Sequence, residues 1–171
     1  MKKKAEIRKK MKISLNSFDL QEKQRQTTLI LDQFLTSEVY RNSEIIAAFM
    51  PMPFEFDMTR VLADQTKQIV IPKTLPNRQM IFTDFDENDL VMTDFGVKEA
   101  LSNVAVTPDL IIVPGLAWSH DGYRVGFGGG YYDRYLANFK GITVSLVYNF
   151  QMVDKMPVDA YDIPIKNIFT I

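Results

Sequence analysis

Two segments at the start of the chain carry apolar residues at helical spacing. In residues 2–16 apolar side chains recur every four positions, as Ile7, Met11 and Leu15. This period predicts a helix. A second helix is predicted over residues 19–35, because the segment opens with an aspartate that is followed three positions later by a glutamate, as in a capping box. A third, shorter helix is expected over residues 57–65.

Short, uninterrupted apolar runs predict buried β-strands between these helices and after them. The runs are residues 45–49, 68–72, 80–85, 110–115 and 142–148, with residues 168–171 as an edge strand. Residues 86–108 have no clear period, and a short helix is expected near residues 97–101. The dipeptide Asp121-Gly122 predicts a tight hairpin turn, and another helix is expected from Tyr131 onward.

Apolar strands that alternate with helices indicate a sheet covered on both faces. We therefore predict an α/β fold with three layers (α/β/α) around a mostly parallel, mixed central sheet of the open, Rossmann-like kind. The chain has 171 residues and contains neither an internal repeat nor a low-complexity linker. A single domain spanning residues 1–171 is expected at this length.

Composition excludes several kinds of chemistry. The chain contains no cysteine, so it has neither disulfides nor a thiolate nucleophile, and a cytoplasmic location is expected. No apolar run reaches the ~20 residues of a membrane span. The tripeptide Ser119-His120-Asp121 is not a catalytic triad, because triad members must converge in space whereas consecutive side chains point apart. No protein nucleophile is therefore expected.

Positive charge is concentrated at the start of the chain. Residues 1–12 hold seven lysines and arginines and one glutamate, whereas the whole chain has a net charge of −1. Lys4 and Arg8 lie four residues apart and border the apolar stripe of the first helix, so both point toward the protein body. Such a row forms a solvated face or binds an anion. The acidic remainder of the chain argues against nucleic acid.

Residues 122–134, with the sequence GYRVGFGGGYYDR, carry the strongest functional signal. The glycines of residues 126–130 let several backbone N–H groups approach one anion, and the helix expected from Tyr131 begins directly behind them. Arg124 supplies a cation suited to phosphate oxygens, and Asp133 supplies an oxygen ligand suited to Mg²⁺. The run is neither a dinucleotide fingerprint nor a Walker A loop. It predicts a polyphosphate and its metal at a loop–helix junction.

The same run resembles the signature of the 5-formyltetrahydrofolate cyclo-ligases, also called methenyltetrahydrofolate synthetases. The likeness extends over nearly the whole chain and includes PGLA at 114–117, FMPMPFE at 49–55, MPVDAYD at 156–162 and the basic opening. It implies conversion of 5-formyltetrahydrofolate to 5,10-methenyltetrahydrofolate with ATP and Mg²⁺, giving ADP and phosphate. In this reaction the formyl oxygen is phosphorylated, and a neighbouring folate nitrogen then closes the ring.

The resemblance also implies a role for individual residues. The nucleotide would be bound by Lys4, Arg8, Arg124, Val125, Gly126, Phe127, Gly128, Gly129, Gly130, Tyr131 and Tyr132. Of these, Arg124, Tyr131 and Tyr132 would be catalytic. Met50 and Glu55 match positions that contact the folate, where one carboxylate can accept two adjacent N–H groups of a pterin. Asp133 and Asp162 match the two aspartates that contact magnesium.

Two other functions stay open at this stage. The chain could bind a nucleotide or folate without turnover, or its basic opening could associate with RNA. The expected partners are the small molecules ATP and 5-formyltetrahydrofolate, with neither nucleic acid nor membrane. The sequence does not distinguish a monomer from a dimer.

Overall fold

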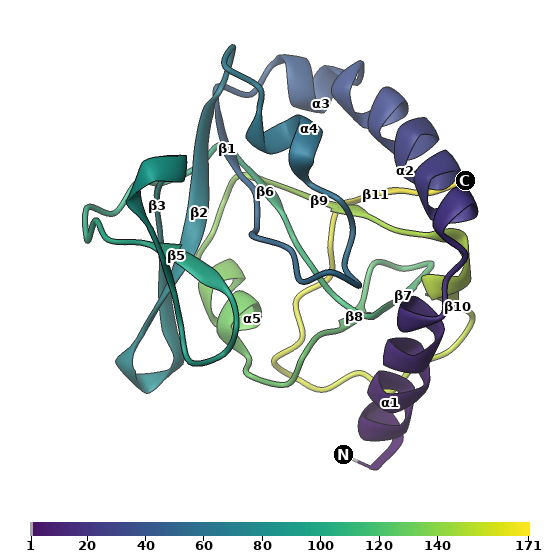
Figure 1. The fold of residues 1–171 in the computed structure, drawn as a ribbon. Helices are drawn as coiled ribbons and strands as arrows, with labels where there is room; N and C mark the ends of the chain where they lie inside the picture. The colour runs from purple at the N-terminus through teal and green to yellow at the C-terminus, as the bar shows by residue number, and fades with distance from the viewer. Residues whose placement is uncertain (1) are drawn as a thin grey trace.

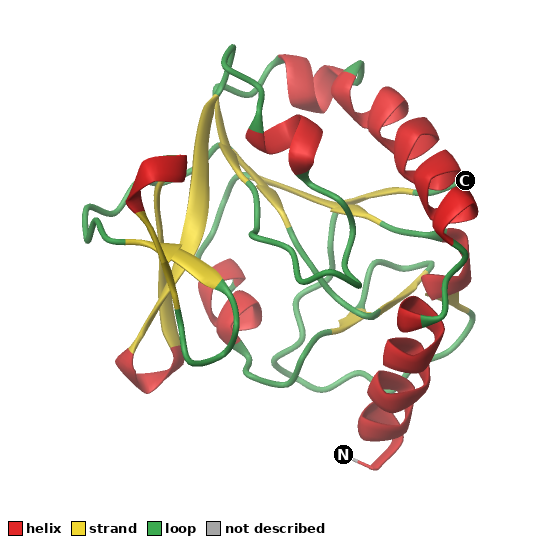
Figure 2. Cartoon of the chain, in the orientation of Figure 1, coloured by secondary structure: helices red, strands yellow, loops and turns green. Residues whose placement is uncertain are grey.

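The protein, described here by a computed structural model of residues 2–171, is built on a six-stranded sheet (Figures 1 and 2). The strand order is β11-β9-β6-β1-β2-β3, and every neighbouring pair is parallel except β2 and β3. The strands are β1 (Ile45–Ala47), β2 (Gln68–Leu75), β3 (Gln79–Asp84), β6 (Leu110–Ile112), β9 (Ile142–Leu146) and β11 (Asn167–Phe169). The predicted mixed, mostly parallel open sheet is confirmed.

Helices lie on both faces of this sheet because successive strand residues point to opposite sides. Ile46 and Ile112 face a core formed with α1 (Lys2–Asn16), α2 (Leu20–Leu35), α3 (Glu38–Arg41) and α4 (Thr59–Leu62). Their neighbours Ala47 and Ile111 face a second core, which includes Leu136 of α5 (Tyr131–Leu136). The α/β/α layering therefore follows from apolar residues at consecutive strand positions, as expected for strands buried on both faces.

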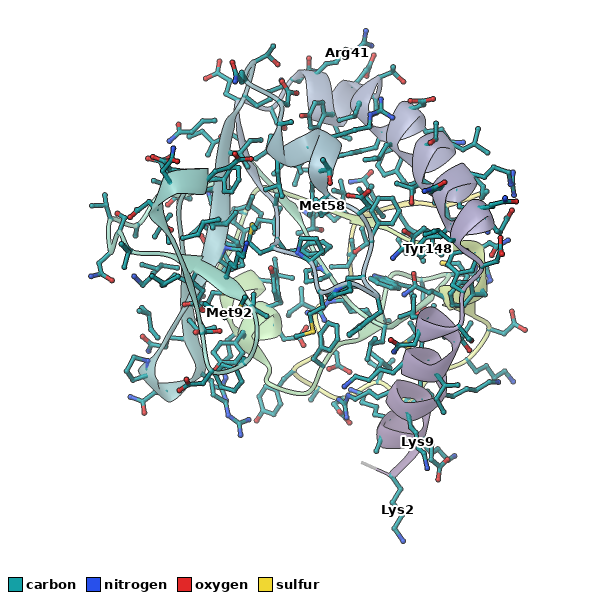
Figure 3. The ribbon with its side chains drawn as sticks, in the orientation of Figure 1. Lys2, Lys9, Arg41, Met58, Met92 and Tyr148 are labelled. Atoms are coloured by element: carbon teal, nitrogen blue, oxygen red, sulfur yellow. The ribbon has the colours of Figure 1, made fainter. Side chains whose placement is uncertain are left out.

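The larger core, on the face of α1 and α2, is closed by aromatic packing around Tyr148. Tyr148 and Met58 are fully buried and lie in the interior of the molecule (Figure 3). The Tyr148 ring contacts Phe18 with 5.1 Å between ring centroids, and its hydroxyl shares a 2.9 Å hydrogen bond with Thr27. The polar end of this buried ring is thus satisfied, and the contact ties α2 to the chain just beyond β9.

A smaller three-stranded sheet delivers the glycine-rich segment to one side of the molecule. It consists of β7 (Ala117–Ser119), β8 (Arg124–Val125) and β10 (Met152–Val153) in the order β10-β7-β8. Strands β7 and β8 are antiparallel, so the predicted hairpin turn at Asp121-Gly122 is confirmed. Gly122 has φ +91°, and a Cβ at this position would lie 2.4 Å from the carbonyl oxygen of Ile165. A side chain is therefore excluded here.

The short helix expected near residues 97–101 is wrong. Residues Lys98–Ala100 form β5, which pairs antiparallel with β4 (Leu90–Met92) across a turn containing Gly96 at φ +76°. Contacts remote in sequence hold this hairpin: Glu99 Oε1 accepts bonds from the backbone N–H and hydroxyl of Thr74. Lys73 Nζ donates to the carbonyl oxygens of Ala100, Leu101 and Ser102. Tertiary contacts override the local helical preference.

The remaining helix predictions agree with the structure apart from their ends. Helix α1 has the expected bounds, and α2 begins directly after Asp19, whose Oδ2 accepts the backbone N–H of Glu22 at 2.9 Å. The Glu22 side chain binds Arg25 instead of returning to the cap, so only half of the capping box forms. Helix α4 is shorter than the predicted segment 57–65. None of the helices within residues 2–171 is long and apolar enough to span a membrane.

Candidate active site

The glycine-rich loop joins β8 to α5, and two of its glycines have left-handed backbone conformations. Gly128 has φ +106°, and Gly130, the N-cap of α5, has φ +73°. At Gly126 and Gly129 the absence of a side chain matters because neighbouring side chains occupy the space that a Cβ would take. A Cβ on Gly126 would lie 2.5 Å from Arg124 Nη1, and one on Gly129 would lie 2.7 Å from the Tyr131 ring. Backbone freedom and close approach of side chains thus account for the glycine run.

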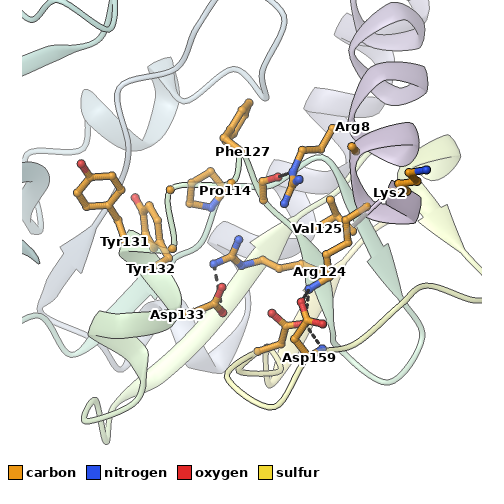
Figure 4. A pocket seen from close by; sticks show the side chains of 17 residues that line it. Lys2, Arg8, Pro114, Arg124, Val125, Phe127, Tyr131, Tyr132, Asp133 and Asp159 are labelled. Carbon is orange, nitrogen blue, oxygen red and sulfur yellow. Dashed lines mark hydrogen bonds and ion pairs between the residues drawn. The ribbon is translucent and has the colours of Figure 1, made fainter. Parts of the chain in front are cut away.

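This loop forms one wall of a cavity of about 670 Å³ (Figure 4). Helix α1, the start of α5 and the segment 159–162 supply the other walls. The lining residues are Lys2, Lys4, Ala5, Arg8, Pro114, Arg124, Val125, Gly126, Phe127, Gly128, Gly129, Gly130, Tyr131, Tyr132, Asp133, Asp159 and Asp162. Every residue that the sequence assigned to nucleotide or magnesium therefore lies on this one cavity.

Helix α1 reaches the cavity through the two cations that the sequence singled out. Arg8 Nε donates to the carbonyl oxygen of Gly126 at 2.8 Å, which fastens the helix to the loop. Lys4 is buried, and its Nζ lies 2.6 Å from Oδ2 of both Asp159 and Asp162. These side-chain bonds and charges raise the pKa of Lys4 against the opposing effect of burial. Lys4 and Arg8 are therefore turned into the protein and do not form a solvated face.

Arg124 is buried at the centre of the site, between Arg8 on one side and the two tyrosines on the other (Figure 4). Its Nη2 lies 3.7 Å from Oδ1 of Asp133, and its Cζ lies 5.7 Å from the centroid of the Tyr132 ring. Burial lowers the pKa of Arg124, whereas the charge of Asp133 opposes this change. The guanidinium remains charged, so a buried cation lies on the cavity with the Asp133 carboxylate as its ion-pair partner.

Two buried polar atoms beside the cavity have no hydrogen-bond partner within residues 2–171. They are Arg124 Nε and the hydroxyl oxygen of Tyr132. Burial raises the pKa of Tyr132, the Arg124 charge lowers it, and the Glu55 carboxylate adds to the rise. Buried polar groups are satisfied in most folded proteins, and each exception calls for an explanation. Both atoms belong to side chains that line the cavity, although the atoms themselves have almost no exposed surface.

Asp133 and Asp162, predicted as metal-contacting residues, line the same cavity although 28 residues separate them. Asp133 Oδ1 accepts the backbone N–H of Ile163 at 3.2 Å, and Asp162 Oδ2 accepts that of Asp159 at 2.7 Å. Within residues 2–171 no three His, Cys, Asp or Glu side chains gather into a metal-binding cluster. This donor set still fits Mg²⁺, which is commonly held by one or two carboxylates together with waters and substrate phosphates.

Met50 and Glu55, predicted as folate contacts, do not line the main cavity. Glu55 lies beside it: it shares a small enclosed space with Pro114, and Pro114 also lines the cavity. Burial raises the pKa of Glu55 to about 7, and the 2.7 Å bond that its Oε2 accepts from Met52 N–H opposes this rise. The centroid of the neighbouring Phe54 ring lies 6.3 Å from the centroid of the Phe127 ring in the glycine loop.

Two charged residues of the cavity wall, Lys2 and Asp159, were not singled out from the sequence. The available signal for Asp159 is its place in the MPVDAYD segment at 156–162, three residues before Asp162. The structure also agrees with the prediction that Ser119, His120 and Asp121 do not form a catalytic triad. His120 is exposed and lies 3.7 Å from Asp154, whereas Ser119 donates to Asp121.

The model of the 5-formyltetrahydrofolate cyclo-ligase family matches residues 1–171. The chain belongs to this family. Its activity is the ATP-dependent ligase reaction that converts 5-formyltetrahydrofolate to 5,10-methenyltetrahydrofolate in folate one-carbon metabolism.

Curated cyclo-ligases and solved structures agree with this assignment. The chain is 28% identical to the 5-formyltetrahydrofolate cyclo-ligase of Mus musculus over 95% of this chain and 90% of the mouse protein. It is 31% identical to that of Escherichia coli K12 over 73% of this chain and 76% of the bacterial one. The Aquifex aeolicus 5,10-methenyltetrahydrofolate synthetase superposes with a TM-score of 0.84 at 31% identity, covering 98% of this chain and 89% of the other. The Mycoplasma pneumoniae synthetase shares the fold, with a TM-score of 0.73 at 24% identity and 97% coverage of both chains.

Proposed function

We propose that the cavity binds the phosphate groups of ATP next to the formyl group of 5-formyltetrahydrofolate, and that the reaction begins with phosphoryl transfer to the formyl oxygen. The observation that carries this proposal is that one cavity is lined by the glycine loop, by the cations Lys4, Arg8 and Arg124, and by the carboxylates of Asp133 and Asp162. The side chains of Arg124 and Tyr132, each with a buried polar atom that lacks a partner within residues 2–171, line the same cavity.

The nucleotide side of the site consists of backbone and cations. The N–H groups of residues 126–130 would bind phosphate oxygens, and Lys4, Arg8 and Arg124 would neutralise their charge. Arg8 is held against Gly126, so cation and loop approach the anion as one unit. Phosphoryl transfer requires positioning and charge stabilisation more than covalent chemistry by the protein, and this set of residues supplies both.

The chemistry proceeds in two steps without a protein nucleophile. The formyl oxygen attacks the γ-phosphorus of ATP, the bond to the β-phosphate oxygen breaks, and ADP leaves. The neighbouring folate nitrogen then attacks the formyl carbon, the carbon–oxygen bond breaks to expel phosphate, and the nitrogen loses its proton. Tyr131 and Tyr132 form the wall beside the reacting groups. The Tyr132 hydroxyl would donate a hydrogen bond to the formyl oxygen or to the phosphate ester derived from it.

Asp133 and Asp162 would hold Mg²⁺, directly or through water. When bound, the ion offsets negative charge on the phosphate oxygens and orients them for in-line transfer. Asp133 is kept in place by the N–H of Ile163 and by the charge of Arg124. Asp162 is kept in place by the N–H of Asp159 and by Lys4.

The folate would lie between the cavity and the segment that contains Met50 and Glu55. Two observations support this placement: the Phe54 ring lies next to that of Phe127 in the loop, with 6.3 Å between ring centroids, and Pro114 borders both spaces. Glu55 would accept N–H groups along the edge of the pterin, and Met50 would pack against its face. The proposal involves small-molecule substrates and a cytoplasmic location, with no nucleic acid.

A direct assay tests the proposal. Mixing the protein with 5-formyltetrahydrofolate, ATP and Mg²⁺ should produce methenyl-folate absorbance together with one ADP and one phosphate per ring closed. Removing Mg²⁺ with a chelator should abolish the signal. Nucleotide binding without any rise in absorbance would contradict the proposal and favour a binding module without turnover.

A further inference from the structure

One ammonium group, Lys4 Nζ, is shared by two carboxylates at the edge of the cavity. Its distance to Oδ2 is 2.6 Å for both Asp159 and Asp162. The backbone N–H of Asp159 also donates to Asp162 Oδ2, at 2.7 Å. Two donors, Lys4 Nζ and the Asp159 N–H, therefore converge on one oxygen atom of Asp162, and Figure 4 shows the Asp159 end of this contact on the cavity wall.

This contact conflicts with the role proposed for Asp162. An ammonium group on Oδ2 opposes the binding of a divalent cation to the same carboxylate, because the two positive charges repel each other. Occupation of Asp162 by magnesium is therefore favoured when Lys4 loosens its hold on Asp162. The Asp159 carboxylate is the other partner of Lys4 and lies on the same wall.

We propose that Asp159 is a positioning residue that keeps the Lys4 ammonium at the cavity edge while Asp162 is released to magnesium. The proposal rests on the role given to Asp162 under Proposed function. With Asp159 present, Lys4 gives up its contact with the Asp162 carboxylate and keeps its contact with the Asp159 carboxylate. Without the Asp159 charge, Lys4 pairs with Asp162 alone among the acidic groups it contacts in residues 2–171, and the metal must compete with that pair.

The exposure of the two side chains fits this division of roles. The Asp159 side chain is 65% exposed and that of Asp162 is 15% exposed. An exposed carboxylate adjusts to a moving ammonium at little cost, whereas the enclosed one keeps a fixed direction into the cavity. A purely structural role would instead assign Asp159 to the turn alone, through its backbone N–H, which any residue except proline retains.

The variant Asp159→Asn separates these roles because it removes the charge and keeps the backbone donor. Binding of the non-hydrolysable ATP analogue AMP-PNP is measured by calorimetry at a series of Mg²⁺ concentrations. We expect the Mg²⁺ concentration for half-maximal binding to rise about threefold, as fits one partly exposed ion pair. Asp159→Glu should restore the original value. Asp154→Asn, whose side chain is 98% exposed, is the control and should leave it unchanged.

Two further variants make the result decisive. In a Lys4→Met background the Asp159→Asn change should have no additional effect, because no ammonium remains to be exchanged. A full effect in that background would overturn the proposal, as would an unchanged or lower Mg²⁺ requirement in Asp159→Asn alone.

The variant Asp162→Asn distinguishes the role of Asp159 from the magnesium role of Asp162. If it shifts the requirement and Asp159→Asn does not, only the role of Asp159 fails. If neither shifts it, the proposed magnesium role of Asp162 fails as well.

Discussion

The guanidinium of Arg124 lies over the ring of Tyr132, with 5.7 Å between Cζ and the ring centroid. Both side chains place a polar atom in the protein interior without a hydrogen-bond partner in residues 2–171. Leaving two such groups unsatisfied lowers the free energy of unfolding. Substitutions of Arg124 and Tyr132 therefore test whether these side chains serve the site and not the stability of the fold.

Replacing Tyr132 with phenylalanine separates function from folding. The variant deletes an unsatisfied buried hydroxyl, so the Tm should stay the same or rise. Turnover should fall by about tenfold or more if the hydroxyl contacts the formyl or phosphate group. Circular-dichroism melting and the methenyl-folate absorbance assay measure the two effects. Unchanged turnover would remove the hydroxyl from the mechanism.

Arg124→Ala should reduce turnover by about 10²-fold or more, as loss of one preorganised donor to developing charge typically does. The comparison is Arg134→Ala, which removes an exposed arginine of α5 that is not part of the cavity wall. Steady-state kinetics with saturating ATP should show the loss in kcat for the first variant and near-normal values for the second. Equal kinetics in both would contradict a catalytic role for Arg124.

Gly126→Ala should act through Arg124. The added methyl group would lie 2.5 Å from Nη1, the end of a long side chain, so the guanidinium would have to move while the loop keeps its fold. We expect a turnover close to that of Arg124→Ala, and no further loss when the two changes are combined. Gly96→Ala is the comparison away from the cavity wall: nothing lies within 4 Å of its added Cβ, but its φ of +76° makes the change strained, so Tm should fall while turnover stays near normal. Additive losses in the double variant would show that the glycine acts independently.

Glu55 should make stability depend on pH. Burial raises its pKa from 4.5 to about 7 in the folded protein. Between these values the folded chain holds a proton that the unfolded chain has lost, so stability should decrease as pH rises through this window, by roughly 3 kcal/mol in total. Denaturant unfolding from pH 4.5 to 8 should show this decline in the native chain and a flatter profile in Glu55→Gln. The exposed Glu87→Gln serves as the control, and parallel profiles for all three chains would refute the prediction.

Short-range patterns were sufficient for most of the fold. The spacing of Ile7, Met11 and Leu15 predicted α1 because a helix has a fixed period, and continuous apolar runs predicted strands buried on both faces. The segment near Val97–Leu101 failed because its hairpin is held by Lys73 and Glu99, and bonds between distant residues leave no local period. The single-domain assignment of residues 1–171 and the roles given to the site residues remain predictions.

The sequence by itself determined the glycine-rich loop, the cations of the first helix and the family, since each is written in adjacent or regularly spaced residues. The tertiary structure decided which of these groups share one cavity, because Lys4 meets Asp162 and Arg8 meets Gly126 across more than a hundred residues of chain. It also added Asp159 and placed Met50 and Glu55 outside the cavity wall. Local steric preferences act between neighbouring residues, whereas a binding site forms when packing of the whole core brings distant segments together.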